Sequence, residues 1–280
     1  MVNWNRAASL ALLAAGAFIP AAAAQNANGA ATTPPHFSSS TSAWLAMGTD
    51  FKEVAGTPAI VTNDAAHPHF GNGQGRQSSF RFADLNNPNL TDFAKQSLKK
   101  TNDEVLRGKA VFSREARCWP TGVPTYDLNQ AQPVYFIQTP KEVVMIWQMD
   151  HQVRHIYLNV PHSQNPKPSW YGESIGHYEG DTLVVDTIGQ NTETFVDNYR
   201  TPHSDKLHVV ERFRLTNGGK NLQADISLED PATFRQPVRM IQTWRQVSQG
   251  PMSESSCAES GPGFFDFDVE PIPTATKADF

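Results

Sequence analysis

The sequence predicts a mainly β fold, an eight-stranded antiparallel up-and-down barrel with one helix and an irregular N-terminal segment. Short β-prone runs follow one another through the second half of the chain, and the run 221–229 alternates strictly between apolar and polar residues. Several links between these runs are short, which indicates antiparallel neighbours. Closing eight such strands into a barrel leaves no exposed edge and leaves room for one small ligand.

The first 24 residues have the pattern of a secretory signal peptide. Arg6 precedes an apolar run over 7–19, and the alanines at 22–24 offer a small-residue cleavage site. The apolar run is too short to cross a membrane, and no later stretch approaches the roughly 20 apolar residues that a spanning helix needs. We therefore expect a periplasmic or secreted mature chain with no membrane span.

Charge and cysteine content restrict the partners and the compartment. The formal net charge is −5 at pH 7, whereas nucleic-acid-binding proteins usually carry basic stripes, so no nucleic acid is expected. The chain has two cysteines, Cys118 and Cys257. Because an even pair in an oxidising compartment is usually bridged, the sequence predicts a disulfide between them, with two free thiols as the alternative.

The segments outside the strands are expected to be mostly irregular. Residues 25–43 are poor in apolar side chains, so we expect a flexible leader there. Residues 251–280 are rich in serine, proline and acidic residues, so we expect a C-terminal tail. Residues 44–117 predict an irregular wrap around the main body. Within it, apolar residues recur at helical spacing over 90–107, and Gly108 supplies a stop. The apolar stripe is narrow, so this helix should pack outside the barrel or across one end.

The strands are expected in a domain that covers 118–250. Residues 221–229 have the pattern of a strand with one buried and one wet face. Residues 179–182 are typical of a tight hairpin, because glycine tolerates the positive φ that such a turn requires. The predicted strands are 134–139, 143–149, 153–159, 174–179, 182–188, 207–216, 221–229 and 238–247.

The links predict two different barrel ends. The links 160–173 and 189–206 are long, whereas 150–152, 180–181 and 217–220 are short. Because successive links of an up-and-down barrel lie at opposite ends, the long links should share one open end. This architecture resembles the calycin class of ligand-holding barrels, to which lipocalins belong. A likeness of fold does not transfer a function.

One block of sequence resembles a family. Residues 172–187, GESIGHYEGDTLVVDT, resemble an uncharacterised family of exported bacterial proteins. Further parts that look like its pattern are 118–124, 154–157, 201–204 and 207–212. The likeness implies export and no particular reaction.

Histidines gather in the predicted barrel, where six of the nine lie between residues 151 and 208. His162 and His203 fall in the two long links, where functional residues are common. His155 lies in a strand and is more simply a hydrogen-bonded barrel residue, and His151 in a short link is more simply a surface residue. With carboxylates and a tyrosine expected at the same end, the candidate catalytic residues are Glu173, His203, His162, Tyr199, Asp186 and His208.

These residue types predict proton-transfer chemistry at the barrel mouth. A histidine paired with a carboxylate can serve as acid and base, and we expect Glu173 and His203 to form that pair. The candidate ligand wall is Tyr157, Trp147, Trp170, Tyr171, His155 and Phe195. The sequence thus predicts an exported, cofactor-independent lyase, isomerase or hydrolase acting on a small apolar or aromatic molecule. The alternatives are a non-catalytic ligand-binding barrel and a structural envelope protein.

Neither a metal site nor covalent catalysis is expected. The histidines lack the His-Glu-x-x-His spacing of zinc sites. A Gly-x-Ser-x-Gly pattern surrounds Ser174, but this serine leads into a strand, whereas a nucleophile elbow leads into a helix. For Asp186, a structural ion pair with Arg154 or Arg212 competes with catalysis, because an unpaired buried charge is costly. The sequence does not indicate an oligomeric state.

Overall fold

The computed structural model describes residues 33–67, 81–107, 118–128, 132–149, 152–248 and 252–255. The predicted signal peptide, His151 and Cys257 lie outside the described residues, so export and the disulfide stay predictions. No helix in the described ranges is both long and apolar enough to cross a membrane.

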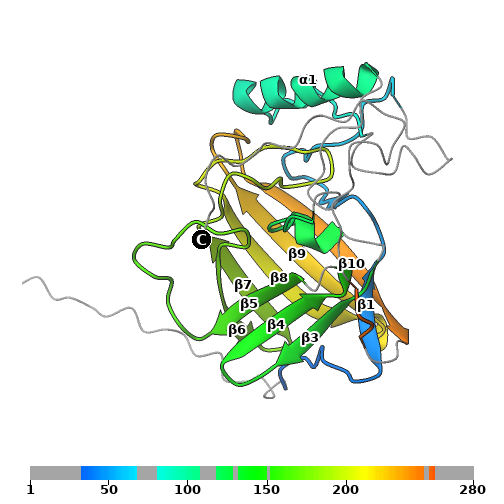
Figure 1. Ribbon diagram of the computed structural model, residues 1–280, viewed down its shortest axis with the longest axis vertical. Helices are drawn as coiled ribbons and strands as arrows, with labels where there is room; N and C mark the ends of the chain where they lie inside the picture. Colours follow the sequence, from blue (N-terminus) through cyan, green and yellow to red (C-terminus); the bar gives the residue numbers. More distant parts are fainter. Residues whose placement is uncertain are drawn as a thin grey trace, which may run out of the picture. The chain divides into compact units, whose positions relative to one another are not determined.

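Within the described chain, nine strands close into a β-barrel (Figure 1). Eight lie where the sequence predicts them: β3 (Val134–Gln138), β4 (Glu142–Trp147), β5 (Gln152–Leu158), β6 (Glu173–Glu179), β7 (Thr182–Ile188), β8 (His208–Thr216), β9 (Asn221–Glu229) and β10 (Val238–Ser248). The ninth, β1 (Ser42–Ala46), pairs with β10 along its whole length and with β3 at Trp44. A short strand, β2 (Lys52–Glu53), pairs with β10 outside the ring.

The predicted count of eight strands is therefore wrong by one. β1 covers the last two residues of the predicted flexible leader, 25–43, and the first three of the predicted irregular wrap, 44–117, so both predictions are wrong there. It joins the ring because Trp44 and Ala46 point into the core, where they are 3% and 5% exposed. The indole of Trp44 also donates a 2.9 Å hydrogen bond to the carbonyl of Phe37.

The expected all-antiparallel order is also wrong at one place. β5 and β6 are parallel, with Ile156 opposite Ser174 and Leu158 opposite Gly176. The strand number requires such a pair, because a closed ring with an odd number of strands cannot alternate direction throughout. A parallel pair needs a crossover of roughly a dozen residues or more. The segment 159–172 provides this crossover.

The parallel pair changes which links share an end. The turns at the closed end are 139–141, 180–181 and 217–220, as the strand registers require. The links 189–207 and 230–237 lie at the opposite, open end. β4 ends and β5 begins at the open end, so the short link predicted at the closed end is misplaced. The long crossover runs from the closed end back to the open end, and only its last part lies where we expected it.

The closed half of the barrel is filled by apolar side chains. The alternation predicted for β9 is confirmed, because Leu222, Ala224 and Ile226 are buried between half-exposed polar neighbours. Near the closed end, the Phe213 ring lies 6.0 Å from that of Trp244 and 6.3 Å from that of Phe136. Among the described residues, the packed closed half therefore leaves no entry for a ligand at that end.

Helix α1 (Asp92–Leu106) lies over the open end, as the narrow apolar stripe predicts (Figure 1). Thr91 caps its first turn by accepting a 3.3 Å hydrogen bond from the amide of Ala94. The amide of Thr91 in turn donates to the carbonyl of Thr233, which ties the helix to the link 230–237. The helix therefore belongs to the cover of the barrel mouth.

Candidate functional site

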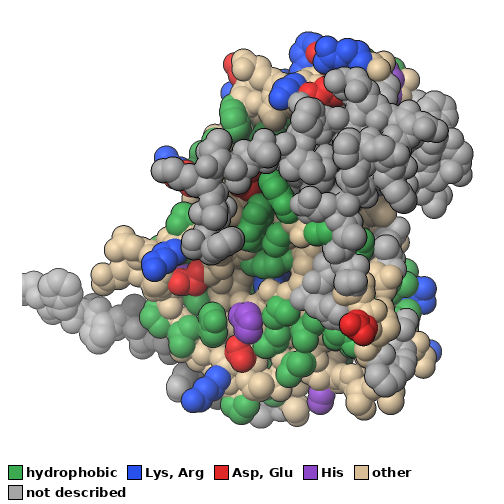
Figure 2. Space-filling view, in the orientation of Figure 1, with side chains coloured by type: hydrophobic (Ala, Val, Ile, Leu, Met, Phe, Trp, Pro, Cys, Tyr) green, Lys and Arg blue, Asp and Glu red, His purple; other side chains and the backbone are tan. Residues whose placement is uncertain are grey.

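Polar side chains meet inside the open half of the barrel. We call five of them the interior cluster: Tyr126, Asp127, Gln152, Arg154 and Glu211. All five are buried, and the most exposed is Gln152 at 8%. Seen from this side, the surface is hollowed above the strands β3–β6, and hydrophobic side chains lie in the hollow (Figure 2). Polar groups in such surroundings are costly unless they are paired, so the partners of each one matter.

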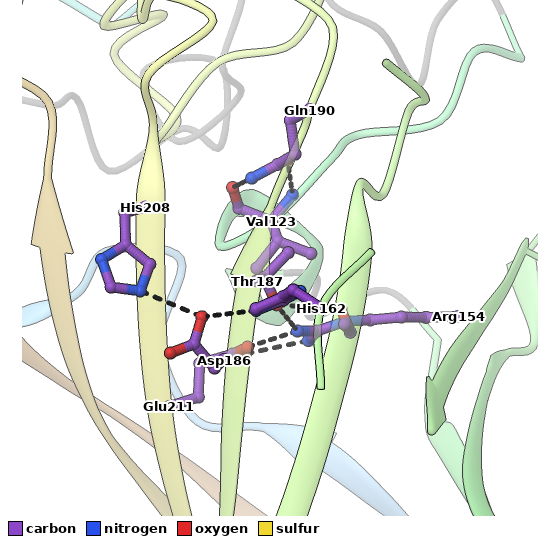
Figure 3. Close-up of polar contacts among 9 residues, drawn as sticks. Val123, Arg154, His162, Asp186, Thr187, Gln190, His208 and Glu211 are labelled. Atoms are coloured by element: carbon purple, nitrogen blue, oxygen red, sulfur yellow. Dashed lines mark hydrogen bonds and ion pairs between the residues drawn. The ribbon is translucent and has the colours of Figure 1, made fainter. Parts of the chain in front are cut away.

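Arg154 and Glu211 form a buried, two-pronged ion pair (Figure 3). Both side chains are 0% exposed, and the Arg154 Nη1–Glu211 Oε1 distance is 2.9 Å. Arg154 also donates to the hydroxyls of Thr187, at 3.0 Å, and Ser174, at 3.3 Å. Desolvation offsets much of the attraction in a buried pair, so this arrangement is weak evidence for a purely stabilising role.

Asp127 lies beside this pair as a second buried carboxyl group. Within the described chain, neither of its side-chain oxygens has a hydrogen-bond donor among the N–H and O–H groups. Burial, and then the charge of Glu211, raise the pKa of Asp127 well above its ordinary value, although Arg154 opposes this. Two carboxyl groups can hydrogen-bond only if one of them holds a proton. Burial beside Glu211 therefore favours the protonated form of Asp127.

The segment that carries Asp127 is held firmly in the barrel mouth. It forms the short 3₁₀ helix η4 (Thr125–Leu128). The side chain of Gln190 binds both backbone groups of Val123, at 2.7 and 2.9 Å (Figure 3). The amide of Gln242 donates to the Asp127 carbonyl at 2.9 Å. Long-range contacts therefore fix the position of the buried acid.

Several polar atoms around the interior cluster have no protein partner. Among the described residues, Trp147 Nε1, Gln152 Nε2 and the Tyr126 hydroxyl are buried without a hydrogen bond. Trp147 faces Gln152 across the β4–β5 pair, and the Tyr126 ring lies 6.3 Å from the Trp147 ring. Because buried polar atoms are normally hydrogen-bonded, this group of exceptions indicates a position for a ligand or ordered water.

Four of the six predicted catalytic residues meet elsewhere, on the outer surface of the sheet. We call His162, Glu173, Asp186 and His208 the outer-face cluster. His162 Nδ1 lies 2.9 Å from Glu173 Oε1, and His162 Nε2 lies 3.0 Å from Asp186 Oδ1. His208 Nε2 is also 3.0 Å from Asp186 Oδ1 (Figure 3). The cluster fastens the crossover 159–172 to β6, β7 and β8.

The expected partners of Glu173 and Asp186 are not the observed ones. His203 is buried, and its ring binds the hydroxyl of Thr194 at 2.7 Å. The structure therefore does not bring Glu173 and His203 together as a proton-transferring pair. Nor does Asp186 pair with an arginine, because Arg154 binds Glu211 and Arg212 binds Glu179.

The predicted ligand wall divides into two groups. Tyr157 and His155 point outward from β5 and are not at the mouth, since Tyr157 is 48% exposed. Trp147 and Tyr171 lie at the interior cluster, where the Tyr171 hydroxyl donates to Gln152 Oε1. The remaining two lie nearby: the Trp170 ring is 5.6 Å from that of Trp119, and the Phe195 carbonyl accepts a hydrogen bond from Thr125 in η4.

Tyr199 lines a separate cavity, together with Asp50, Phe51, Ile60 and Val61 of the N-terminal segment. This cavity has a volume of about 20 Å³, and Tyr199 and Asp197 line it. That is room for about one water, whereas small-molecule sites usually measure ~300–1,000 Å³. Burial, and then the charge of Asp50, raise the pKa of Tyr199. The structure therefore separates this residue from the interior cluster.

The interior cluster was missed although its sequence signals exist. Arg154 alternates with outward residues on β5, and Glu211 shares a face with Val209 and Phe213. A charged residue at an inward position is a candidate for function. Asp127 carries no such signal, because η4 is placed in the mouth by contacts distant in sequence.

Similarity to known proteins does not identify a function for this chain. No protein-family model matches this chain, and no curated protein sequence matches it. Across the described ranges, no three histidine, cysteine, aspartate or glutamate side chains gather so that they could hold a metal ion. Ser174 leads into β6 and binds Arg154 and Thr187, as expected for a serine that does not lie on a nucleophile elbow.

The outer-face cluster makes stability depend on pH. The hydrogen bond to Asp186 raises the pKa of His208 above its ordinary 6.5. The same bond lowers the pKa of Asp186 below its ordinary 3.8. The stability from His208 is therefore fully present below about pH 6.5 and is lost as the pH rises through its folded-state pKa. The stability from Asp186 is present above about pH 3.8 and is lost at lower pH.

We expect His208→Gln to lower the free energy of unfolding by about 0.5–1 kcal/mol at pH 5.5 and by less at pH 8.5. The effect is small because the His208 side chain is 38% exposed to solvent. Urea unfolding of both proteins at the two pH values measures it. An equal loss at both values would contradict a charged histidine.

Proposed function

We propose that this protein is an exported acid–base enzyme that acts on a small, partly aromatic molecule inside the open half of its barrel. The observation that supports it best is the pair of buried carboxyl groups, Asp127 and Glu211. Like charges held close together push one proton onto the pair, and such pairs are used for acid–base catalysis. A lyase or an isomerase fits this site, because both reactions can proceed by proton transfer alone.

Each residue of the pair has a distinct role in this proposal. Asp127 donates its proton to a substrate atom that gains negative charge. Arg154 holds Glu211 in a two-pronged ion pair, so the Asp127 carboxylate that is left after proton transfer lies buried beside a second carboxylate group. This makes the Asp127 carboxylate a strong base that takes a proton back from another position of the substrate. One residue can therefore act as acid and then as base.

Asp127→Asn tests the proposal, because the amide keeps the shape of the protonated acid but has no proton to transfer. Purified mature protein is incubated with pooled small metabolites, and mass spectrometry identifies any compound that it converts. We expect Asp127→Asn to lower the turnover of such a compound by roughly 10²–10⁴-fold with little change in melting temperature.

Glu173→Gln is the matched control, since it removes one carboxylate from the outer-face cluster. We expect its turnover to stay within about twofold of wild type. The reverse outcome, with only Glu173→Gln inactive, would move catalysis to the outer-face cluster. A compound that binds to the protein but is never converted would indicate the alternative function, a ligand-binding barrel.

A further inference from the structure

The unpartnered atoms at the interior cluster are mainly hydrogen-bond donors. Trp147 Nε1 can only donate, and its side chain is 1% exposed. The Gln152 amide has its oxygen occupied by the Tyr171 hydroxyl, so its unpartnered nitrogen is also a donor. The Tyr126 hydroxyl adds a further O–H group. A ligand that satisfies these groups must present an acceptor, and an oxygen atom is the common choice.

The charges of the cluster favour a neutral ligand group. Arg154 has its guanidinium occupied by Glu211, Thr187 and Ser174. Its charge is therefore balanced by Glu211, and the protonated Asp127 adds none. An anionic group would be buried without a free positive partner, which is costly. The acceptor therefore belongs to a neutral group, such as a carbonyl, rather than to a carboxylate or a phosphate.

The surrounding rings favour a planar skeleton. The Tyr126 ring meets the Trp147 ring at 69° and the Tyr171 ring at 89°, with centroids 6.3 and 5.5 Å apart. An aromatic or conjugated ligand can adopt the same edge-to-face geometry with these rings. Trp147 and Tyr126 thus supply both an apolar wall and a donor.

We infer that the substrate of the proposed reaction is a neutral carbonyl compound on a planar, ring-bearing skeleton, and that its carbonyl oxygen binds the donors of Trp147 and Gln152. The inference rests on the proposed function for its reaction, but its ligand class follows from the unpartnered donors, the balanced charges and the aromatic rings of the site. In the reaction, these donors stabilise negative charge that develops on the carbonyl oxygen.

A matched set of benzene derivatives tests the ligand class: acetophenone as the neutral carbonyl, benzoate as the anion and ethylbenzene without oxygen. Binding is measured by calorimetry and by the indole N–H signals in nitrogen-labelled protein. We expect acetophenone to bind at least about tenfold more tightly than either of the others and to shift one indole N–H signal, which is absent from Trp147→Phe.

Trp147→Phe keeps an aromatic ring and removes the donor, so it should weaken acetophenone binding by about tenfold. Trp244→Phe, at the buried closed end of the barrel, is the control and should change it less than twofold. If Trp147→Phe does not fold, Tyr126→Phe removes a neighbouring donor with less change in shape and should weaken binding by about threefold or more.

A failure of the inferred ligand class can be distinguished from a failure of the proposed function. Tighter binding of benzoate, equal binding of the three compounds or unchanged binding in the donor variants would overturn the ligand class. If no compound shifts an indole signal, the donors hold ordered water and the inference is wrong. The proposed function is judged separately, by the turnover of Asp127→Asn, and either result can occur without the other.

Discussion

Arg154→Met is expected to destabilise the folded protein by about 3–5 kcal/mol, the usual loss when one partner of a buried ion pair is removed. Methionine fills much of the same volume but leaves Glu211, which is 0% exposed, without its two charged donors. Asp127 would then lie beside an uncompensated carboxylate. Urea unfolding followed by tryptophan fluorescence measures the change.

Arg212→Met provides a closely matched control. Arg212 directly follows Glu211 on β8 and therefore points outward. There it pairs with Glu179, and its side chain is 43% exposed. An exposed pair contributes only about 0–1 kcal/mol, so this variant should remain close to wild type. Similar losses in the two arginine variants would show that burial of the Arg154–Glu211 pair does not determine the effect.

Replacing both partners separates the charge from the packing. Arg154→Met combined with Glu211→Leu removes the uncompensated carboxylate and should recover much of the lost stability, because apolar replacements of buried ion pairs are often neutral or stabilising. The double variant should nevertheless stay inactive, because in the proposed function the carboxylate of Asp127 is a strong base only beside the carboxylate of Glu211. A stable double variant with wild-type turnover would contradict the proposed function.

The positions of the strands could be predicted from the sequence because alternation of apolar and polar residues is a local property. The direction of β6 could not be predicted in the same way, since parallel and antiparallel neighbours share that pattern. The length of the crossover 159–172 was the available signal, because a hairpin needs only a few residues and a parallel pair needs about a dozen. β1 was missed because its residues, SAWLA, do not alternate between apolar and polar, and its buried positions do not alternate either.

The candidate site, like the strand order, could be predicted only where a local sequence pattern places the side chain. Alternation places His155 and Tyr157 on the face opposite Ile156, so their outward direction was available from the sequence. The pairing of His162 with Glu173 and Asp186 depends on the path of the crossover 159–172. That path could not be predicted, because β5 and β6 were expected to be antiparallel. Asp127 reaches the barrel interior through contacts with Gln242, which is distant in sequence, and no local pattern predicts that.

Gly172→Ala is expected to destabilise the protein by roughly 2–4 kcal/mol, the sum of a backbone and a steric effect. Gly172 has a φ of +65°, which disfavours any residue with a Cβ atom. An added Cβ would also lie closer to the Ile188 carbonyl oxygen than van der Waals contact allows, and 3.0 Å from Gln190 Cγ. Because a backbone oxygen of β7 cannot move aside easily, the crossover must shift.

Gly218→Ala separates the two effects. Gly218 has a φ of +62°, but no atom lies within 4 Å of its added Cβ among the described residues, so only the backbone effect of about 1 kcal/mol applies. Gly172 lies between Tyr171, which reaches Gln152 in the interior, and Glu173, which binds His162 outside. A shift there should weaken both clusters, so Gly172→Ala should also reduce ligand binding while Gly218→Ala should not. Equal losses of stability in the two variants would show that the close approach to Ile188 is unimportant.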